Sequence, residues 1–173
     1  MAEGHNQRGQ LRPRPFFRES LVLDEEQARG RMGADSRLLF FETLPSSIEV
    51  VELLIARLFG RLGTLGCMNG QRAELEIVLR EAVANAIIHG NDNDASKRVD
   101  VRCFLDGSNC LWFVVRDQGR GFDATGVPDP TESANLQRSC GRGIFLIRHF
   151  MDRVEFARQG SEIRMCKKLP KIA

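Results

Sequence analysis

The residues best suited to chemistry lie within one apolar stretch, from Glu81 to Asn91. Every residue from Ala82 to Ile88 is apolar except Asn85. Glu81 and Asn85 are four residues apart, so on a helix their side chains lie on one face, one turn apart. A carboxylate and a carboxamide at that spacing form a compact oxygen-rich site that suits a hard cation such as Mg²⁺. The alternative is that Asn85 is a satisfied core amide and Glu81 the solvated end of the apolar face.

A second motif, Asp117-Gln-Gly119-Arg-Gly121-Phe122, directly follows an apolar run. That run, residues 110–116, predicts a central strand. Glycines placed just after a strand let the backbone bend beside a ligand without Cβ clashes. Asp117 at this bend could accept a hydrogen bond from an exocyclic amine such as the adenine N6. Taken alone, the motif is equally typical of an ordinary Asp-Gly turn.

A third motif, Gly141-Arg142-Gly143, opens a run over residues 144–151 that predicts a short buried helix. Glycines at a helix start expose backbone N–H groups at the positive end of the dipole, which suits a phosphate. Arg138 and Arg142 add charge that can meet phosphate oxygens. The motif is weak by itself. It lacks the Gly-Lys-Ser/Thr ending of a Walker A loop, and also the strand and third glycine of a Rossmann fingerprint.

Hydrophobic periodicity predicts the elements that position these motifs. Apolar residues recur at helical spacing in two long segments and alternate at strand spacing in the others. The predicted order is a strand at 37–43, helices at 48–62 and 71–89, strands at 98–105 and 110–116, the helix at 144–151, and a closing hairpin of 154–157 and 162–167. This order suits an α+β two-layer sandwich, a sheet with helices on one face.

Composition indicates a folded domain of ordinary charge. The chain has 173 residues, of which 42% are hydrophobic and 28% charged, enough for one domain with a sizeable core. A net charge of +2 is too small to favour direct binding to nucleic acid or to a membrane surface. No apolar run approaches the roughly 20 residues that span a bilayer, and no apolar segment follows the polar, Arg-rich N-terminus. We therefore expect a cytoplasmic protein.

The cysteines do not predict a metal or redox site. They stand at positions 67, 103, 110, 140 and 166, with no Cys-x-x-Cys pair and no His at zinc-ligand spacing. An odd, scattered set of this kind is typical of small core side chains or of free thiols in a reducing compartment.

The first 35 residues differ from the rest. Four arginines alternate with Gly and Pro up to Arg18, and Pro13 and Pro15 prevent a regular helix there. Residues 20–32 could form a short helix, because acidic residues come early in it and basic residues late. We therefore expect a flexible basic arm at 1–35, with or without that helix, followed by a folded domain at 36–170.

In this order, the three motifs resemble the nucleotide-binding fold of gyrase, the Hsp90 chaperones, histidine kinases and MutL, known as the Bergerat or GHKL fold. Residues 81–90, 141–147 and 151–154 are similar to those of the small bacterial anti-sigma factor serine/threonine kinases of the RsbW and SpoIIAB type. The likeness covers about residues 36–168. It implies a mixed, mostly antiparallel sheet with helices on one face, and ATP and Mg²⁺ as cofactors.

The resemblance also implies roles for the helical motif. Asn85 would hold the Mg²⁺ that bridges the ATP phosphates. Glu81 would be the general base that takes the proton from an attacking hydroxyl. His89 would either contact phosphate or simply lie at the helix C-terminus, where a cation is favourable.

The other implied contacts concern the adenine and the phosphates. Asp117 would bind the adenine amine beside a wall formed by Gly119 and Gly121, with Phe122 following them. Ser161 lies where such domains often place a hydroxyl near the adenine. The phosphates would be lined by Arg138, Gly141, Arg142 and Gly143.

The spacing of the motifs narrows the resemblance. Only 19 residues, 122 to 140, separate Gly121 from Gly141, which indicates a compact lid. His5 lies outside any predicted long helix, which disfavours a self-phosphorylating histidine kinase. Gyrase, Hsp90 and MutL carry further domains that have no counterpart in this sequence.

Two functions therefore stay open. The first is a kinase that phosphorylates a Ser or Thr of an anti-anti-sigma partner with the STAS fold, sequesters a sigma factor and forms a homodimer. The second is a non-catalytic regulator that binds a protein partner in an ATP-dependent way. A lesser third is a regulator of another signalling system that kept the fold.

Overall fold

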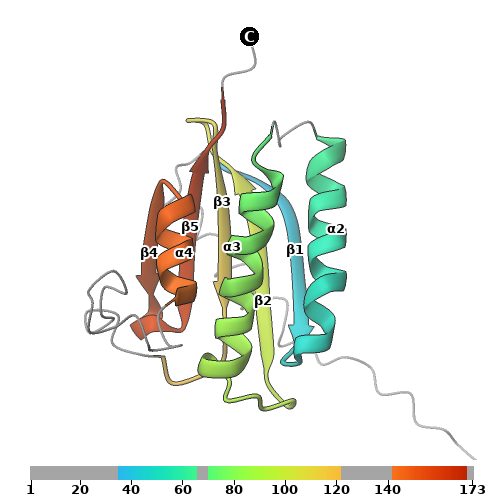
Figure 1. Ribbon diagram of the computed structural model, residues 1–173, viewed down its shortest axis with the longest axis vertical. Helices are drawn as coiled ribbons and strands as arrows, with labels where there is room; N and C mark the ends of the chain where they lie inside the picture. The colour runs from blue at the N-terminus through green and yellow to red at the C-terminus, as the bar shows by residue number, and fades with distance from the viewer. Residues whose placement is uncertain (1–34, 66–69, 122–141, 171–173) are drawn as a thin grey trace, which may run out of the picture. The chain divides into compact units, whose positions relative to one another are not determined.

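The computed structural model describes residues 35–65, 70–121 and 142–170 of the chain. Its strands form a five-stranded sheet of order β1-β2-β3-β5-β4, and helices α2, α3 and α4 lie on one face of it (Figure 1). The elements are β1 (Arg37–Pro45), η1 (Ile48–Val50), α2 (Val51–Thr64), α3 (Arg72–Asn85), η2 (Ala86–Gly90), β2 (Arg98–Leu105), β3 (Cys110–Arg116), α4 (Arg142–Phe150), β4 (Arg153–Ala157), η4 (Arg158–Gly160) and β5 (Glu162–Lys168). The predicted α+β sandwich is confirmed.

The sheet is more regular than the mixed sheet that we expected, because each neighbouring pair in the described sheet is antiparallel. Its register places Val101 opposite Val115, and Val115 opposite Ile163. Since side chains alternate along a strand, the odd-numbered residues of β2, β3 and β5 form the face that the helices cover. The predicted strands at 98–105 and 110–116 have the observed bounds.

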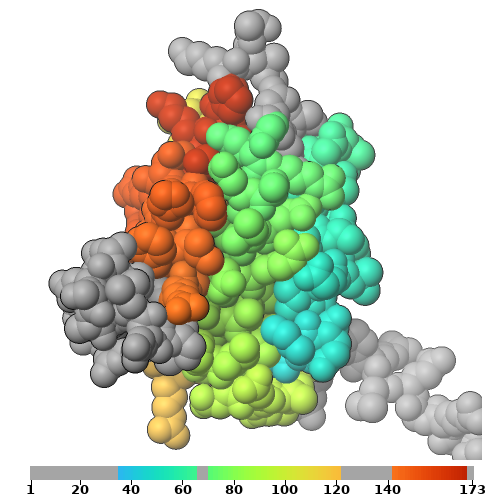
Figure 2. Space-filling model, viewed as in Figure 1, coloured from blue at the N-terminus to red at the C-terminus, as the bar shows by residue number. Residues whose placement is uncertain are grey.

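The core lies between this face of the sheet and the helices. In the space-filling view, the helices cover this face of the sheet (Figure 2). Phe59 of α2 is fully buried, and its ring centroid lies 6.5 Å from that of Phe113 on β3. The buried side chains of α3 recur at helical spacing: Leu75, Val78, Leu79, Ala82 and Val83. At roughly 1.5–3 kcal/mol for each large apolar side chain, this burial fixes α3 against the middle of the sheet. Residues on the opposite face of α3 are thereby held in a defined orientation.

The predicted helix at 71–89 is observed in two parts. α3 ends at Asn85, and the chain continues as the π-helical turn η2. There the N–H of Asn91 donates to the carbonyl of Ala86 at 2.8 Å, and the N–H of Asn93 donates to the carbonyl of Ile87 at 2.9 Å. The π-helix is rare in proteins. Where a single π turn does occur, it is often at a functional site.

The other helices and the closing hairpin differ little from prediction. α4 begins at Arg142 and not at 144, and the hairpin of β4 and β5 turns through η4 as expected. The described cysteines, Cys103, Cys110 and Cys166, are free thiols. None of the helices in the described ranges is long and apolar enough to cross a membrane. The arm at 1–35, apart from Asp35, and its predicted helix lie outside the described residues.

Candidate functional site

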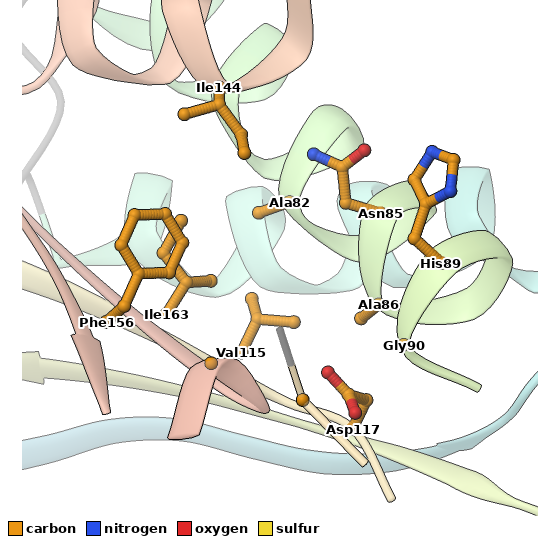
Figure 3. Close-up of a pocket in the computed structure, with 12 residues that line it drawn as sticks. Ala82, Asn85, Ala86, His89, Gly90, Val115, Asp117, Ile144, Phe156 and Ile163 are labelled. Carbon is orange, nitrogen blue, oxygen red and sulfur yellow. The ribbon is translucent and has the colours of Figure 1, made fainter. Parts of the chain in front are cut away.

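A cavity of about 100 Å³ lies between the end of α3, the start of α4 and the sheet. Most of its lining is apolar, and its polar groups come from α3, η2 and the loop after β3 (Figure 3). The lining residues are Ala82, Asn85, Ala86, His89, Gly90, Val115, Asp117, Gly121, Ile144, Phe156, Gly160 and Ile163. The cavity therefore joins the helical motif to the Asp-Gly motif, which are 27 residues apart between Gly90 and Asp117.

At one end of the cavity, Asp117 leaves β3 with only 9% of its surface exposed. Its carboxylate Oδ1 accepts a hydrogen bond from the N–H of Gly119 at 2.8 Å. Its own N–H donates to the carbonyl of Ser161 at 3.0 Å. Burial raises the pKa of the Asp117 carboxyl above its usual range, and the bond from Gly119 opposes that rise.

Close backbone contacts fix the loop that carries Asp117. A Cβ on Gly119 would overlap the carbonyl oxygen of Gly90, and a Cβ on Gly90 would lie 2.5 Å from Asp117 Oδ2. Gly121 has a φ of +75°, and a Cβ there would overlap the carbonyl oxygen of Gln159. The sequence predicted that Gly119 and Gly121 let the backbone bend. They also let the loop after β3 approach the backbone of Gly90 and of Gln159 closely. We refer to Asp117, Gly90, Gly119 and Gly121 as the Asp117 end.

At the other end, the first turn of α4 lies directly over the Glu81 and Asn85 pair. A Cβ on Gly143 would lie 2.5 Å from Glu81 Oε2 and 3.2 Å from Asn85 Nδ2. Figure 3 shows Asn85 and His89 projecting from the same side of α3 and η2, one turn apart. His89 is exposed and Glu81 is half-buried. We refer to Glu81, Asn85, His89 and Gly143 as the Glu81 end.

The Glu81 end suits a metal only together with a ligand. No group of three or more His, Cys, Asp or Glu side chains in the described ranges could hold a metal by itself. Mg²⁺ usually keeps several waters and takes one or two protein oxygens plus phosphate oxygens. The Asn85 amide and the Glu81 carboxylate, which lie together beneath Gly143, provide oxygens of the type used in such coordination.

The structure brings most of the predicted site residues together. Asn85, His89, Asp117 and Gly121 line the cavity, and Glu81, Gly119 and Gly143 adjoin it. Arg142 is exposed as the first residue of α4. Phe122, Arg138 and Gly141 lie outside the described residues.

The Ser161 hydroxyl is bonded within its own turn, and its expected contact with adenine stays a prediction. Its hydroxyl donates to the carbonyl of Arg158 at 2.9 Å, within the turn between β4 and β5, and Ser161 does not line the cavity. Its backbone carbonyl is the part that reaches the site, through the bond from the N–H of Asp117.

The sequence analysis did not identify two sets of residues at or beside the site. Phe156 and Ile163 line the cavity but had been interpreted only as strand residues, because alternation does not distinguish a pocket wall from the core. Asn91 is fully buried, and the sequence analysis gave it no role in the site. The available signal was its position directly after Gly90, at the end of the apolar helix.

The fold and the site define a class of nucleotide-binding domain, and the sequence comparison agrees. Residues 44–167 match the family described as the histidine kinase-like ATPase domain. The chain belongs to this family.

Within the histidine kinase-like ATPase family, the chain is similar to anti-sigma factors and to a serine-protein kinase. The chain is 36% identical over 104 residues to the anti-sigma F factor of Oceanobacillus iheyensis, covering 57% of this chain and 70% of that protein. It is 31% identical over 135 residues to the serine-protein kinase RsbW of Staphylococcus epidermidis, covering 74% of this chain and 85% of that protein. The resemblance to anti-sigma factor kinases is thereby confirmed.

A solved structure has the same fold. The crystal structure of the RsbU and RsbW domains of Rv1364c from Mycobacterium tuberculosis superposes with a TM-score of 0.54 at 20% identity. The match covers 78% of this chain and 33% of that longer chain.

Proposed function

We propose that this protein is an ATP-binding anti-sigma factor kinase. It would phosphorylate a Ser or Thr of an anti-anti-sigma protein with the STAS fold, sequester a sigma factor and form a homodimer. Family membership and the names of the similar proteins support this proposal. The observation that carries the kinase part is the Glu81 carboxylate beside Asn85, beneath the first turn of α4.

The adenine would enter the described cavity at the Asp117 end. An ionised Asp117 would accept a hydrogen bond from the exocyclic amine, and apolar side chains such as Val115 and Ile163 would contact the ring. The cavity of about 100 Å³ is well below the roughly 300 Å³ at the lower end of drug-sized ligand sites. It therefore suits the base alone, with the rest of the nucleotide extending toward α4.

The phosphates would lie between Asn85 and the N-terminus of α4. The first N–H groups of a helix have no partner within it and favour an anion. Asn85 would hold Mg²⁺ through its amide oxygen, while Arg142 and the backbone of Gly143 would contact phosphate oxygens. When bound, Mg²⁺ neutralises charge on the transferring phosphoryl group.

Glu81 would act as the general base. The oxygen of the partner's hydroxyl attacks the γ-phosphorus, the bond between that phosphorus and the β-γ bridging oxygen breaks, and ADP leaves. The proton of the hydroxyl goes to the Glu81 carboxylate. A positioned base of this kind contributes typically about 10²–10⁴-fold to the rate.

The test is transfer of labelled γ-phosphate from ATP into proteins of a source-cell lysate, followed by acid treatment of the labelled bands. Glu81→Gln keeps the shape of the side chain and removes its basicity, so we expect a loss of about 10²–10⁴-fold in transfer with ATP binding retained. Glu74→Gln is the matched control, because Glu74 is an exposed residue of the first turn of α3, two turns before Glu81.

Each outcome separates the candidate functions. Acid-stable, Glu81-dependent label on a small protein would support the kinase and identify its substrate. ATP binding without Glu81-dependent label would contradict the kinase and favour the non-catalytic regulator. Acid-labile label on this chain would point to a histidine kinase.

A further inference from the structure

Three residues from separate segments form a closed ring of hydrogen bonds behind Asp117. Asn91 Oδ1 accepts from the N–H of Gln118 at 2.9 Å. Gln118 Oε1 accepts from the N–H of Arg98 at 2.8 Å. The carbonyl of Arg98 accepts from Asn91 Nδ2 at 3.0 Å, which closes the ring. The ring ties the end of η2 to the start of β2 and to the loop after β3.

The ring specifies an amide at position 91. One neighbour is a backbone N–H, which can only donate, and the other is a backbone carbonyl, which can only accept. The orientation of the Asn91 amide is therefore determined, and its side chain is 0% exposed. A buried side chain that lacked either group would leave a backbone partner unsatisfied.

The ring bears directly on the Asp117 end of the site. Gln118 is the residue between Asp117 and Gly119, and Asn91 follows Gly90. The Gly90 carbonyl lies so close to Gly119 that a Cβ there would overlap it, and Gly90 also adjoins the Asp117 carboxylate. The bond from the N–H of Gln118 to Asn91 Oδ1 therefore joins two residues that directly adjoin this contact, and the bond to Arg98 anchors Asn91 at the start of β2.

We propose that Asn91 is a positioning residue for base recognition, which holds the Asp117 carboxylate where it meets the exocyclic amine of adenine. This proposal rests on the proposed function, because it requires ATP as the ligand. Asn91 itself does not line the cavity and acts through Gln118 and Gly90. A merely structural role would weaken the fold without changing which base is preferred.

The experiment compares binding of ATP with binding of purine riboside 5′-triphosphate, which is ATP without the 6-amino group, by titration calorimetry. A hydrogen bond to a charged group is worth roughly 1.5–3 kcal/mol, so we expect wild type to prefer ATP about tenfold or more. In Asn91→Ser, which is neutral and leaves the charge around Asp117 unchanged, we expect that preference to fall to about twofold. Affinity for the purine analogue should change much less.

Two further variants keep the test decisive. Asn109→Ser is the control, because Asn109 Nδ2 also donates to backbone carbonyls, those of Leu169 and Pro170, but in the turn at the other end of β3. It should lower the melting temperature and leave the ATP preference intact. Gln118→Ala opens the ring from its exposed side, so it should fold even where Asn91→Ser does not, and should reduce the preference about threefold.

The outcomes distinguish this proposal from the proposed function. An unchanged ATP preference in both Asn91→Ser and Gln118→Ala, or an equal loss in Asn109→Ser, would overturn the positioning role. ATP binding by the wild type with no preference over the purine analogue would also overturn it, but would leave an ATP-dependent kinase standing. A wild-type protein that binds neither nucleotide would refute the proposed function itself.

Discussion

The two ends of the site are constructed differently. At the Asp117 end, a nearly buried carboxylate accepts a hydrogen bond from the N–H of Gly119, and the backbone N–H of Asp117 donates to the carbonyl of Ser161, just before β5. Glycine contacts that admit no Cβ surround Asp117. At the Glu81 end, His89 is exposed, Glu81 is half-buried, and the close contact to the pair comes from Gly143. The first arrangement is preorganised for one ligand group. The second is less buried, so its side chains can be reached from solvent. Substitutions should therefore affect binding and stability together at the Asp117 end, but should affect transfer or Mg²⁺-dependent binding, with little change in stability, at the Glu81 end.

Gly119→Ala should give the largest effect on binding, because its Cβ would overlap the carbonyl of Gly90, and a backbone group cannot turn aside as the end of a flexible side chain can. We expect ATP affinity to fall by more than about 100-fold and the free energy of unfolding to fall by about 1–3 kcal/mol, measured by calorimetry and urea denaturation. Gly60→Ala is the control, since nothing lies within 4 Å of a Cβ at that exposed α2 position. Tight ATP binding by Gly119→Ala would break the comparison, because it would show that the Asp117 end can rearrange.

Asn85→Ala should remove the dependence of ATP binding on Mg²⁺. We expect its ATP affinity with Mg²⁺ to fall about tenfold, to the value that the wild type shows in EDTA, because one of the few protein oxygens at the Glu81 end is lost. Melting temperature should change little, since this side chain is only partly buried. Mg²⁺-dependent binding retained by the variant would rule out Asn85 as the ligand.

Gly143→Ala should have a smaller effect, because its Cβ would meet the end of the flexible Glu81 side chain and not a backbone. We expect transfer to fall several-fold while ATP affinity stays within about twofold. Stability should be nearly unchanged, because the preference of a helix for alanine over glycine, about 1 kcal/mol, offsets the cost of the contact with Glu81. If Gly143→Ala instead lowered stability as much as Gly119→Ala, the two ends would not differ in rigidity.

The pH dependence of binding should give the smallest but most specific effect. The folded state raises the pKa of Asp117, so the folded protein binds this proton more readily than the unfolded chain does. As pH rises from the unfolded pKa to the raised folded pKa, this group lowers stability, whereas the ATP preference over the purine analogue should increase. Calorimetry and melting curves between about pH 4 and 7 would test these opposite trends. Asp117→Asn should abolish both the pH trend in stability and the pH trend in ATP preference. If the variant kept either trend, Asp117 would not be the group that causes that trend.

Helical periodicity was sufficient to predict that Glu81 and Asn85 lie together on one face of a helix. Asn85 and His89 project from one side of α3 and η2 (Figure 3), and Glu81 meets Gly143 beside Asn85, because α3 is packed through its other face. The strand bounds of β2 and β3 followed from alternation and from the turn between them. The helix face and the strand bounds depend on residues close together in the sequence, so the local sequence pattern is enough to predict them.

The features that could not be predicted depend on segments far apart in the sequence. The ring of Asn91, Gln118 and Arg98, and the bond from the N–H of Asp117 to the carbonyl of Ser161, form only when separate segments come together. The sequence likewise does not reveal that β5 lies between β3 and β4.

The position of β5 has a consequence for synthesis of the protein. β5 lies beside β3 in the sheet, and the N–H of Asp117 is paired with the carbonyl of Ser161, immediately before β5. A nascent chain that has emerged only as far as α4 contains every residue proposed to contact phosphate or metal, but has no partner strand for Asp117. Nucleotide binding should therefore begin only after residues 162–168 have left the ribosome, so that ATP would report completion of the domain.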